Sequence, residues 1–222
     1  MSQPGAGRRS ATFIPFLPFL GVSVLHLAGQ LVHLSWLATW TKPLIVAGLA
    51  LALLWMVRWR PSRVVVVTLV ALFFGWLGDL ALALSGETWF LAGLGSFLVG
   101  HLVYCWLFLR LLGRGRLPWP AFVLLVPFAT LLVVLAPHLG GMLVPVAVYA
   151  AVITAMAITA TRCSPRVTAG ATLFLISDSL LALDKFLPLA AIWESGFLIM
   201  LSYIAAQGLI TAGVARHALR TA

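Results

Sequence analysis

Long blocks of apolar residues run through the chain, and short polar or basic stretches separate them. A helix needs about 20 mostly apolar residues to cross the hydrocarbon core of a bilayer. Windows of that length predict eight membrane-spanning helices, at residues 13–32, 43–57, 64–84, 89–112, 119–137, 141–161, 167–186 and 188–216. The pattern therefore predicts an all-α polytopic membrane protein in which residues 1–222 form a single transmembrane domain.

The composition favours the same fold class and excludes several others. Of the 222 residues, 63% are hydrophobic and 9% are charged, whereas a soluble domain has roughly half apolar and a quarter charged residues. A disordered chain and an ordinary cytosolic enzyme are therefore excluded. The two cysteines, Cys105 and Cys163, are not expected to form a disulfide framework.

The formal net charge of +9 comes from arginines that occupy alternate connections between the predicted spans. With eight spans, every arginine falls on one side of the membrane, and only Lys42 and Lys185 fall on the other. This distribution indicates membrane topology rather than a nucleic-acid partner. The arginines are Arg8, Arg9, Arg58, Arg60, Arg63, Arg110, Arg114, Arg116, Arg162, Arg166, Arg216 and Arg220.

Basic residues are retained on the cytoplasmic side of a membrane. We therefore expect both termini to be cytoplasmic, in a bacterial-type inner membrane or a plasma membrane. A basic start followed by an apolar block, without an evident cleavage site, predicts that the first span is an uncleaved signal anchor.

A weak internal repeat has an offset of 99 residues. The offset aligns Asp79 with Asp178, together with the Leu-Ala-Leu that follows each, and it aligns Tyr104 with Tyr203. The two aspartates belong to spans three and seven, which cross the membrane in the same direction. This predicts two parallel four-helix halves, an arrangement that can place a site where the halves meet.

Asp79 and Asp178 are the most informative residues, because each lies inside an apolar span at a matching depth in the extracytoplasmic half. A carboxyl group inside the hydrocarbon core costs a few kcal/mol or more, so it usually marks a functional site. A structural role, in which each aspartate bonds a hydroxyl group of a neighbouring helix, is the alternative. Two aspartates at equal depth favour the functional interpretation.

Other polar residues share helix faces near the aspartates. His101 and Tyr104 lie on one face of span four, and Tyr203 and Gln207 lie on one face of span eight. Lys42, at the start of span two, can extend toward the outer interface or into the bundle. Simpler roles for these residues are packing for the tyrosines, a satisfied interior histidine, and an interface anchor for the lysine.

Several kinds of chemistry have no motif in this chain. It contains no His-Glu-x-x-His, no paired Cys-x-x-Cys, no Walker loop and no Gly-x-Ser-x-Gly. A metal site or another cofactor is therefore not expected. Two buried carboxyl groups suit hydrolysis through an oxocarbenium-like state, in which one group delivers a proton and the other positions water. They equally suit a proton-coupled carrier or lipid-handling protein, and a non-catalytic membrane partner protein is a third possibility.

The order and spacing of these residues resemble the YhhN family of multi-span lysoplasmalogenases. The resemblance extends from about residue 42 to residue 207. The residues that carry it are Lys42, Pro43, Leu44, Gly78, Asp79, Leu82, Phe90, Gly93, Phe97, His101, Tyr104, Phe108, Gly170, Phe174, Ser177, Asp178, Leu180, Ala182, Phe186, Tyr203 and Gln207.

The resemblance implies hydrolysis of the vinyl ether bond of a lysoplasmalogen to a fatty aldehyde and a glycerophospho-ethanolamine or -choline. Under this reading, Asp79 and Asp178 share the acid and base roles, in either order. Lys42 meets the phosphate of a lysophospholipid substrate that enters sideways from the bilayer, and no metal or cofactor takes part. The residues expected to orient the head group and water are His101, Tyr104, Tyr203 and Gln207.

Overall fold

The structure is a computed structural model that describes residues 14–187 and 192–221. Arg8 and Arg9, the first residue of the predicted span 13–32 and the first four residues of the predicted span 188–216 lie outside this range. Within the described residues the chain is helical and contains no strand, as the apolar pattern predicts.

Eight long helices follow one another along the described chain, with short connections between them. They are α2 (Leu17–Leu31), α3 (Ser35–Met56), α4 (Arg63–Leu82), α5 (Glu87–Leu107), α6 (Leu125–Leu139), α7 (Leu143–Ala160), α8 (Pro165–Phe186) and α9 (Ser195–Thr221). Four short helical segments adjoin them: η1 (Ile14–Phe16), η2 (Phe108–Leu112), η3 (Trp119–Leu124) and η4 (Gly140–Met142).

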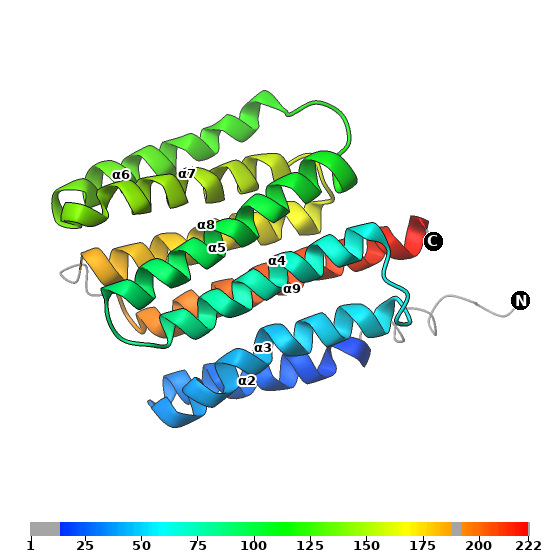
Figure 1. The fold of residues 1–222 in the computed structure, drawn as a ribbon, viewed down its shortest axis with the longest axis horizontal. Coiled ribbons are helices and arrows are strands. Elements are labelled where there is room, and N and C mark those ends of the chain that lie inside the picture. The colour runs from blue at the N-terminus through cyan, green and yellow to red at the C-terminus, as the bar shows by residue number, and fades with distance from the viewer. Residues whose placement is uncertain (1–13, 188–191, 222) are drawn as a thin grey trace, which may run out of the picture.

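Seven segments of the described chain are long and apolar enough to cross a membrane. The longest, Trp119–Ala160, contains both α6 and α7. The chain reverses direction near Gly140, whose φ of +49° suits glycine, and Figure 1 shows α6 and α7 side by side. The predicted spans 119–137 and 141–161 therefore both fall in this one segment.

The predicted start of the second span is wrong. The apolar window placed it at Pro43, because the stretch before it, residues 35–42, contains several polar residues. In the structure α3 begins eight residues earlier, at Ser35, and continues through Pro43. A proline inside a helix removes one backbone hydrogen bond, and membrane helices tolerate that loss when neighbouring groups compensate. Lys42 therefore lies inside a helix rather than at its first residue.

The last span also differs from its predicted bounds of 188–216. Helix α9 begins at Ser195, directly after Glu194, whose positive φ of 43° is incompatible with a right-handed helix. At the other end α9 continues to Thr221, beyond the apolar block, through a turn that contains Arg216 and Arg220.

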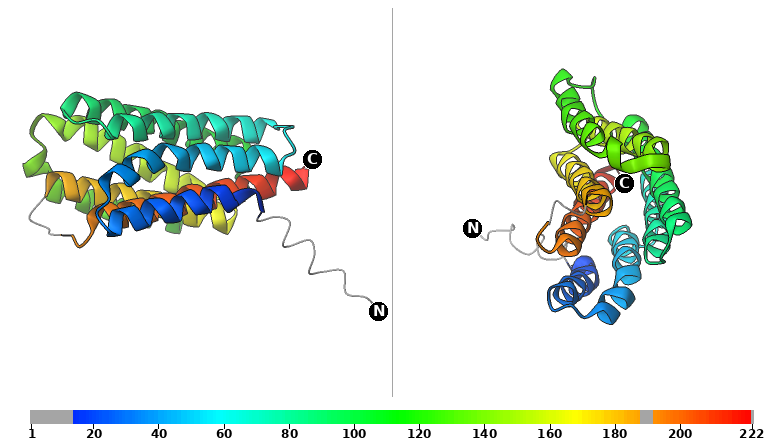
Figure 2. Two further views of the ribbon diagram at one scale, coloured as in Figure 1. Left: turned by 90° about the horizontal axis from the view of Figure 1, so that it is seen from below. Right: turned by 90° about the vertical axis from the view of Figure 1, so that its left-hand side faces the viewer.

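The helices run roughly parallel or antiparallel to one another, as the views in Figures 1 and 2 show. Helices α2 and α3 form one flank, α6 and α7 form the opposite flank, and α4, α5, α8 and α9 lie between them. In the centre α4 packs along α5, and α8 packs along α9. Helix α3 contacts α9 and α5 contacts α7, so both flanks are attached to the central helices.

Small residues allow the central helices to approach closely, as is usual in membrane bundles. Ser96 Oγ on α5 donates a hydrogen bond to the Phe74 carbonyl on α4, at 2.6 Å. Ser177 Oγ on α8 donates similarly to the Ile199 carbonyl on α9, at 2.9 Å. At Gly170 on α8, a Cβ atom would lie 2.7 Å from a carbonyl oxygen of α9, so only glycine fits without displacement.

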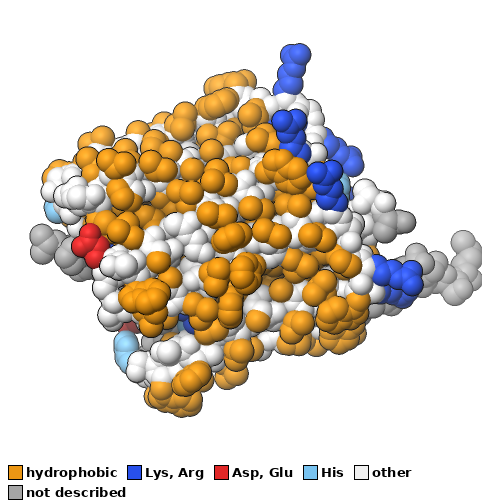
Figure 3. Space-filling model, in the orientation of Figure 1, with side chains coloured by type: hydrophobic (Ala, Val, Ile, Leu, Met, Phe, Trp, Pro, Cys, Tyr) orange, Lys and Arg blue, Asp and Glu red, His pale blue; other side chains and the backbone are white. Residues whose placement is uncertain are grey.

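The outer surface of the bundle matches a lipid environment. Leucine, valine and isoleucine side chains are exposed on many helices, and hydrophobic side chains cover most of the face shown in Figure 3. Eight of the nine tryptophans are also exposed, as is typical of residues at the two membrane interfaces. They are Trp36, Trp40, Trp55, Trp59, Trp89, Trp106, Trp119 and Trp193. The chain is therefore an integral membrane protein.

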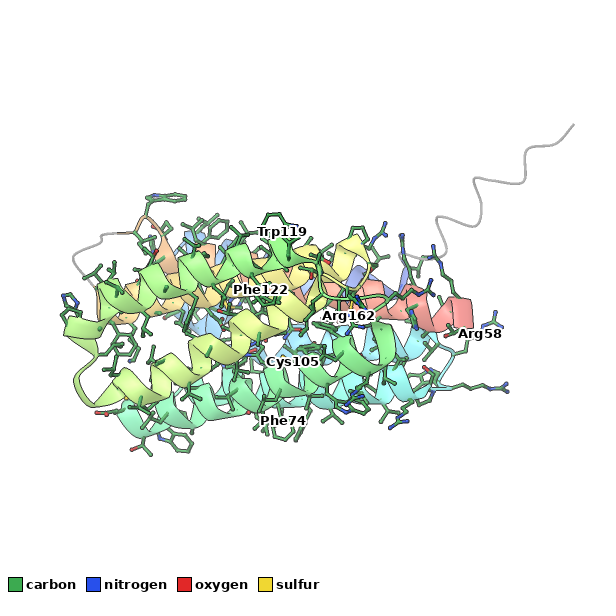
Figure 4. All side chains as sticks on the ribbon, turned by 90° about the horizontal axis from the view of Figure 1, so that it is seen from above. Arg58, Phe74, Cys105, Trp119, Phe122 and Arg162 are labelled. Atoms are coloured by element: carbon green, nitrogen blue, oxygen red, sulfur yellow. The ribbon has the colours of Figure 1, made fainter. Side chains whose placement is uncertain are left out.

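Charge is divided between the two ends of the bundle. In Figure 3 most of the visible basic side chains gather at one end of the face, and an acidic side chain lies at the other. Arg58 and Arg162, from two different connections, lie toward the same end in Figure 4. The C-terminal end of α9 also lies there (Figure 1).

Candidate active site

Asp79 lies near the C-terminal end of α4, and two side chains from other helices bind its carboxyl group. Lys42 Nζ on α3 lies 3.4 Å from Oδ1. The Tyr203 hydroxyl on α9 donates a hydrogen bond of 2.7 Å to Oδ2. Asp79 is 4% exposed, so this carboxyl group is paired almost entirely with protein atoms.

A chain of hydrogen bonds extends from Asp79 into the core. The Tyr104 hydroxyl on α5 donates to Gln207 Oε1 at 3.0 Å. Gln207 Nε2 donates to the Tyr203 hydroxyl at 3.5 Å, and Tyr203 in turn donates to Asp79. Every donor in this series points toward the carboxyl group, an arrangement that suits an ionised acceptor.

Asp178 lies on α8 and binds a different partner. The Tyr149 hydroxyl, on α7, donates a hydrogen bond to Asp178 Oδ2. The ion pairs among residues 14–187 and 192–221 give Asp178 no lysine or arginine. The neighbouring Ser177 donates to the α9 backbone, which fixes the rotation of α8 and leaves Asp178 facing α7.

The two aspartates line the same small cavity, of about 60 Å³, which is bounded by α3, α4, α5, α7, α8 and α9. Lys42, Tyr149 and Tyr203, which bind the two carboxyl groups, also line it. The remaining wall is apolar and consists of Leu82, Phe90, Leu94, Phe97, Leu181, Ile199 and Met200, with Ser177 as the one other polar residue. A reacting group in this cavity would therefore meet both carboxyl groups.

A second cavity, also of about 60 Å³, adjoins the first on the side of Asp178. The two share Phe90, Leu94, Tyr149, Asp178 and Leu181 as lining residues. The rest of the second cavity is formed mainly by apolar side chains of α6, α7 and α8, so Asp178 and Tyr149 lie where an apolar space meets a polar one. The α6 residues in its wall are Pro127, Phe128, Leu131, Leu132 and Leu135.

His101 is buried on α5 behind the two aspartates. Its ring packs against Phe174, with centroids 4.7 Å apart, and against Tyr149, with centroids 5.5 Å apart. Neither ring nitrogen has a hydrogen-bond partner in the structure. His101 thus contacts the tyrosine that binds Asp178, and it forms no hydrogen bond with either aspartate.

Local packing on α3 explains how Lys42 reaches Asp79. Trp76 Nε1 on α4 donates to the Pro43 carbonyl at 3.0 Å, which joins α3 to α4 one residue from Lys42. On its other side, the Thr41 hydroxyl donates to the Leu37 carbonyl, so it accepts a hydrogen bond from His26 Nδ1 on α2. These contacts hold the turn of α3 that contains Lys42.

The structure gathers most of the residues that the sequence singled out. Lys42 and Tyr203 contact Asp79 and line the shared cavity. Tyr104 and Gln207 reach Asp79 only through Tyr203, and with His101 they are absent from the walls of the two cavities described above. These three residues therefore lie behind the site rather than at its surface.

Sequence reasoning missed Tyr149. The 99-residue offset relates Tyr104 to Tyr203 and Asp79 to Asp178. Since Tyr203 binds Asp79 in the structure, the repeat would predict that Tyr104 binds Asp178, whereas Tyr149 does so. One signal was available, because the chain contains only three tyrosines. All three are buried. Tyr203 and Tyr104 belong to the hydrogen-bonded series at Asp79, and Tyr149 binds Asp178.

No group of three or more histidine, cysteine, aspartate or glutamate side chains with a geometry suited to a metal ion occurs in the described part of the chain. The site is instead built from carboxyl, phenol, amide and ammonium groups. Such groups can donate, accept and relay protons.

Together, the fold and site define an all-helical integral membrane protein with two carboxyl groups in one intramembrane cavity. A family model described as the YhhN family matches residues 37–214, and the chain belongs to that family. The matched range includes both aspartates and every residue that binds them. No curated protein and no solved structure matches the chain.

Proposed function

We propose that the protein is a membrane-embedded hydrolase that cleaves the vinyl ether bond of lysoplasmalogens. The products are a fatty aldehyde and a glycerophospho-ethanolamine or -choline. The observation that carries the proposal is the cavity shared by Asp79 and Asp178, which adjoins an apolar cavity. Membership of the YhhN family is consistent with this reaction.

The partners of the two aspartates support a division of roles. Asp79 is paired with the Lys42 ammonium group and accepts a hydrogen bond from Tyr203, so it acts as the ionised carboxylate. Asp178 faces the apolar cavity and binds the neutral Tyr149 hydroxyl, so it acts as the protonated carboxylic acid. Two carboxyl groups in different environments can hold different protonation states at one pH.

The reaction begins when Asp178 transfers its proton to the vinyl carbon that is not bonded to oxygen. The carbon–carbon double bond becomes a single bond, and the neighbouring carbon becomes an oxocarbenium ion. Water adds to this cation while Asp79 accepts a proton from the water. The resulting hemiacetal collapses as its hydroxyl proton passes to Asp178 and Asp79 gives its proton to the departing glycerol oxygen. The products are the aldehyde and the glycerol hydroxyl group, and both carboxyl groups regain their starting protonation states.

The two cavities provide places for the two halves of the substrate. The alkenyl chain occupies the apolar cavity among α6, α7 and α8, which it enters sideways from the lipid. The head group lies toward Lys42, which is partly exposed and can contact the phosphate. Tyr203 positions water beside Asp79. Gln207 and Tyr104 hold Tyr203 in place, and His101 packs against Tyr149.

The proposed topology has eight crossings. Helix α6 with its preceding segment η3, and helix α7, each cross the bilayer, although both belong to one continuous apolar segment. The end of the bundle that carries the arginines is cytoplasmic, so both termini are cytoplasmic and the site lies in the outer half of a bacterial-type inner membrane or a plasma membrane. The 99-residue offset relates α5 to α9 and α3 to α7. The contacts of α5 with α7 and of α9 with α3 are therefore equivalent, and their presence supports two parallel four-helix halves.

Aldehyde release by the purified protein in detergent tests this function. The substrates are lysoplasmenyl-ethanolamine and lysoplasmenyl-choline, and the variants are Asp79→Asn and Asp178→Asn. Asp184→Asn is the matched control, because Asp184 is an exposed carboxylate on the same helix as Asp178. We expect aldehyde from the wild type and from Asp184→Asn, and a loss of at least 100-fold in each cavity variant.

Two results would contradict the proposal. A folded wild-type protein that releases no aldehyde from either substrate would favour the proton-coupled carrier or lipid-handling role. Full turnover by a folded Asp79→Asn or Asp178→Asn variant would show that the reaction does not use this carboxyl pair.

A further inference from the structure

A third cavity, of about 370 Å³, lies at the arginine-bearing end of the bundle, away from the two aspartates. Its size is within the range of small-ligand sites. Charged and apolar side chains both form its wall. The lining residues are Leu112, Arg114, Arg162, Cys163, Ser164, Arg166, Gly213, Arg216, His217, Arg220 and Thr221.

Five arginines reach this cavity from three separate parts of the chain. Arg114 follows α5 and η2, Arg162 and Arg166 flank the start of α8, and Arg216 and Arg220 belong to the last turns of α9. Retention of arginines on one side of a membrane does not require them to surround a common space. Arg58, in the α3–α4 connection, is at the same end and does not line the cavity.

Arg162 is held in place by the protein backbone. Its Nε donates to the Gly115 carbonyl at 2.9 Å, and Nη1 lies 3.5 Å from the Leu109 carbonyl. The Arg114 amide in turn donates to the Arg162 carbonyl at 2.9 Å. These bonds fix the connection after α5 against the α7–α8 connection, so the Arg162 side chain and the Arg114 backbone are positioned before any ligand arrives.

No side-chain carboxylate of the chain is available to neutralise this group. The chain has five acidic residues, and none of them lines the cavity. Asp79 and Asp178 line the cavity of the candidate active site, and Glu87, Asp184 and Glu194 lie at or next to helix ends away from the arginines. An anion that neutralises the arginines must therefore come from outside these side chains.

The start of α8 adds to the positive potential of the cavity. Ser164 is the N-cap residue of this 22-residue helix, and its side chain makes no capping hydrogen bond. The first backbone N–H groups of a helix favour an anion. Both Ser164 and Arg166, in the first turn, line the cavity.

We propose that this cavity binds a phosphate group at the cytoplasmic surface, such as the phosphodiester head group of an anionic phospholipid. Guanidinium groups bind phosphate oxygens in pairs of hydrogen bonds, and basic pockets between membrane helices on the cytoplasmic side bind anionic lipid head groups. The apolar part of the wall, including Leu112, matches the glycerol and first methylene groups of a lipid. The inference does not rest on the reaction proposed above.

Thermal unfolding of the full-length protein in a neutral detergent tests the proposal, with three added compounds. They are phosphatidylglycerol, phosphatidylcholine and inorganic phosphate. A ligand that binds only the folded state raises the Tm in a saturable way, and we expect this of phosphatidylglycerol but not of phosphatidylcholine. The double variant Arg166→Gln/Arg220→Gln should weaken the apparent affinity by at least tenfold, because it removes two of the five guanidinium groups that line the cavity. It should still fold, because both side chains are exposed and make no bond that the fold needs.

The matched control is Arg58→Asn/Arg60→Gln, which removes two positive charges from the same end outside the cavity. Asparagine is used at residue 58 because φ there is +52°. The control should stay within twofold of the wild-type affinity. Saturable protection by inorganic phosphate that competes with the lipid would identify a free phosphate as a ligand, whereas protection by the lipid alone would identify the head group.

The proposal is overturned if neither phosphatidylglycerol nor phosphate protects saturably, or if the cavity variant and the control weaken binding equally. In the second case the arginines act only as a diffuse membrane charge. The single variant Arg166→Gln, expected to lose about threefold in affinity, provides the same comparison against Arg60→Gln if the double variant does not fold.

Discussion

The two aspartates of the site have different nearest partners. Asp79 has an ammonium group and a phenol, and Asp178 has a phenol alone. Both carboxyl groups line one cavity, and in the proposed reaction this difference in partners distinguishes the proton donor from the base. Substitutions of Tyr149 and Lys42, which supply those partners, therefore test the proposed division of roles.

Tyr149→Phe should lower kcat/KM for aldehyde release by about 10- to 100-fold with little change in Tm. The hydroxyl group donates to Asp178, and that hydrogen bond strengthens as Asp178 loses its proton in the transition state. Each tenfold corresponds to about 1.4 kcal/mol. Tyr104→Phe is the control, because its hydroxyl reaches Asp79 only through Gln207 and Tyr203. Equal losses in both variants would argue against a direct role for Tyr149.

Lys42→Met should destabilise the protein by about 1–3 kcal/mol, because Asp79 would remain as a buried charge without its cation. The value is below that of a fully buried pair, since Lys42 is partly exposed. Adding Asp79→Asn should restore part of the stability without restoring activity. Thermal unfolding of the two single variants and the double variant measures this coupling, and strictly additive losses would mean that the ion pair is not formed in the membrane.

At the scale of elements, close helix pairs position the site. The packing of α4 on α5 places Asp79 in one cavity with Phe90 and Phe97. The packing of α8 on α9 places Asp178 in the same cavity with Tyr203. Both pairs depend on small residues where the backbones approach. The aromatic rings of Phe97, Phe174 and Tyr203 then fill the space between the pairs, in edge-to-face contacts.

Gly170→Ala tests the α8–α9 approach. Its new methyl group would lie 2.7 Å from the Ala206 carbonyl oxygen, a backbone atom that cannot rotate away. Overpacking of this kind costs about 1–3 kcal/mol, which for a chain of this length is about 2–4 °C in Tm per kcal/mol. Gly95→Ala is the matched control, because no atom lies within 4 Å of its added methyl group. An unchanged Tm for Gly170→Ala would mean that the two helices lie farther apart than described.

Much of this arrangement could be predicted from the sequence, because a membrane imposes simple rules on it. The apolar blocks predicted the helices, and Asp79 and Asp178 were visible because a carboxyl group in such a block is costly. The apolar window misplaced the start of α3, since the first eight residues of this helix include the polar Ser35, Thr39, Thr41 and Lys42. Tyr149 could not be assigned, because a tyrosine in an apolar block is ordinary and its partner is 29 residues away.

At the scale of the whole molecule, the protein has an acidic site toward one end and a basic cavity at the other. The basic cavity was not predictable, because its arginines come from three parts of the chain and meet only in the folded bundle. The positions of both features relative to the membrane depend on the proposed eight crossings.

Cysteine labelling in intact cells tests these crossings. Single cysteines replace Ser85, Gly141 or Ser164 in a Cys105→Ala/Cys163→Ala background. A membrane-impermeant maleimide should label positions 85 and 141 in intact cells, and position 164 only after permeabilisation. Position 141 protected from the reagent, or position 164 labelled in intact cells, would contradict separate crossings by α6 and α7.

The most direct test of the central claim is the position of deuterium in the aldehyde that the wild-type protein releases in D₂O. If Asp178 protonates the vinyl carbon, each newly formed aldehyde carries one deuterium on the carbon next to the carbonyl group, as measured by mass spectrometry within a few turnovers. The Asp178→Asn variant should form no such aldehyde, and Asp184→Asn should match the wild type. Aldehyde without that deuterium, or labelled aldehyde at the wild-type rate from Asp178→Asn, would contradict the account.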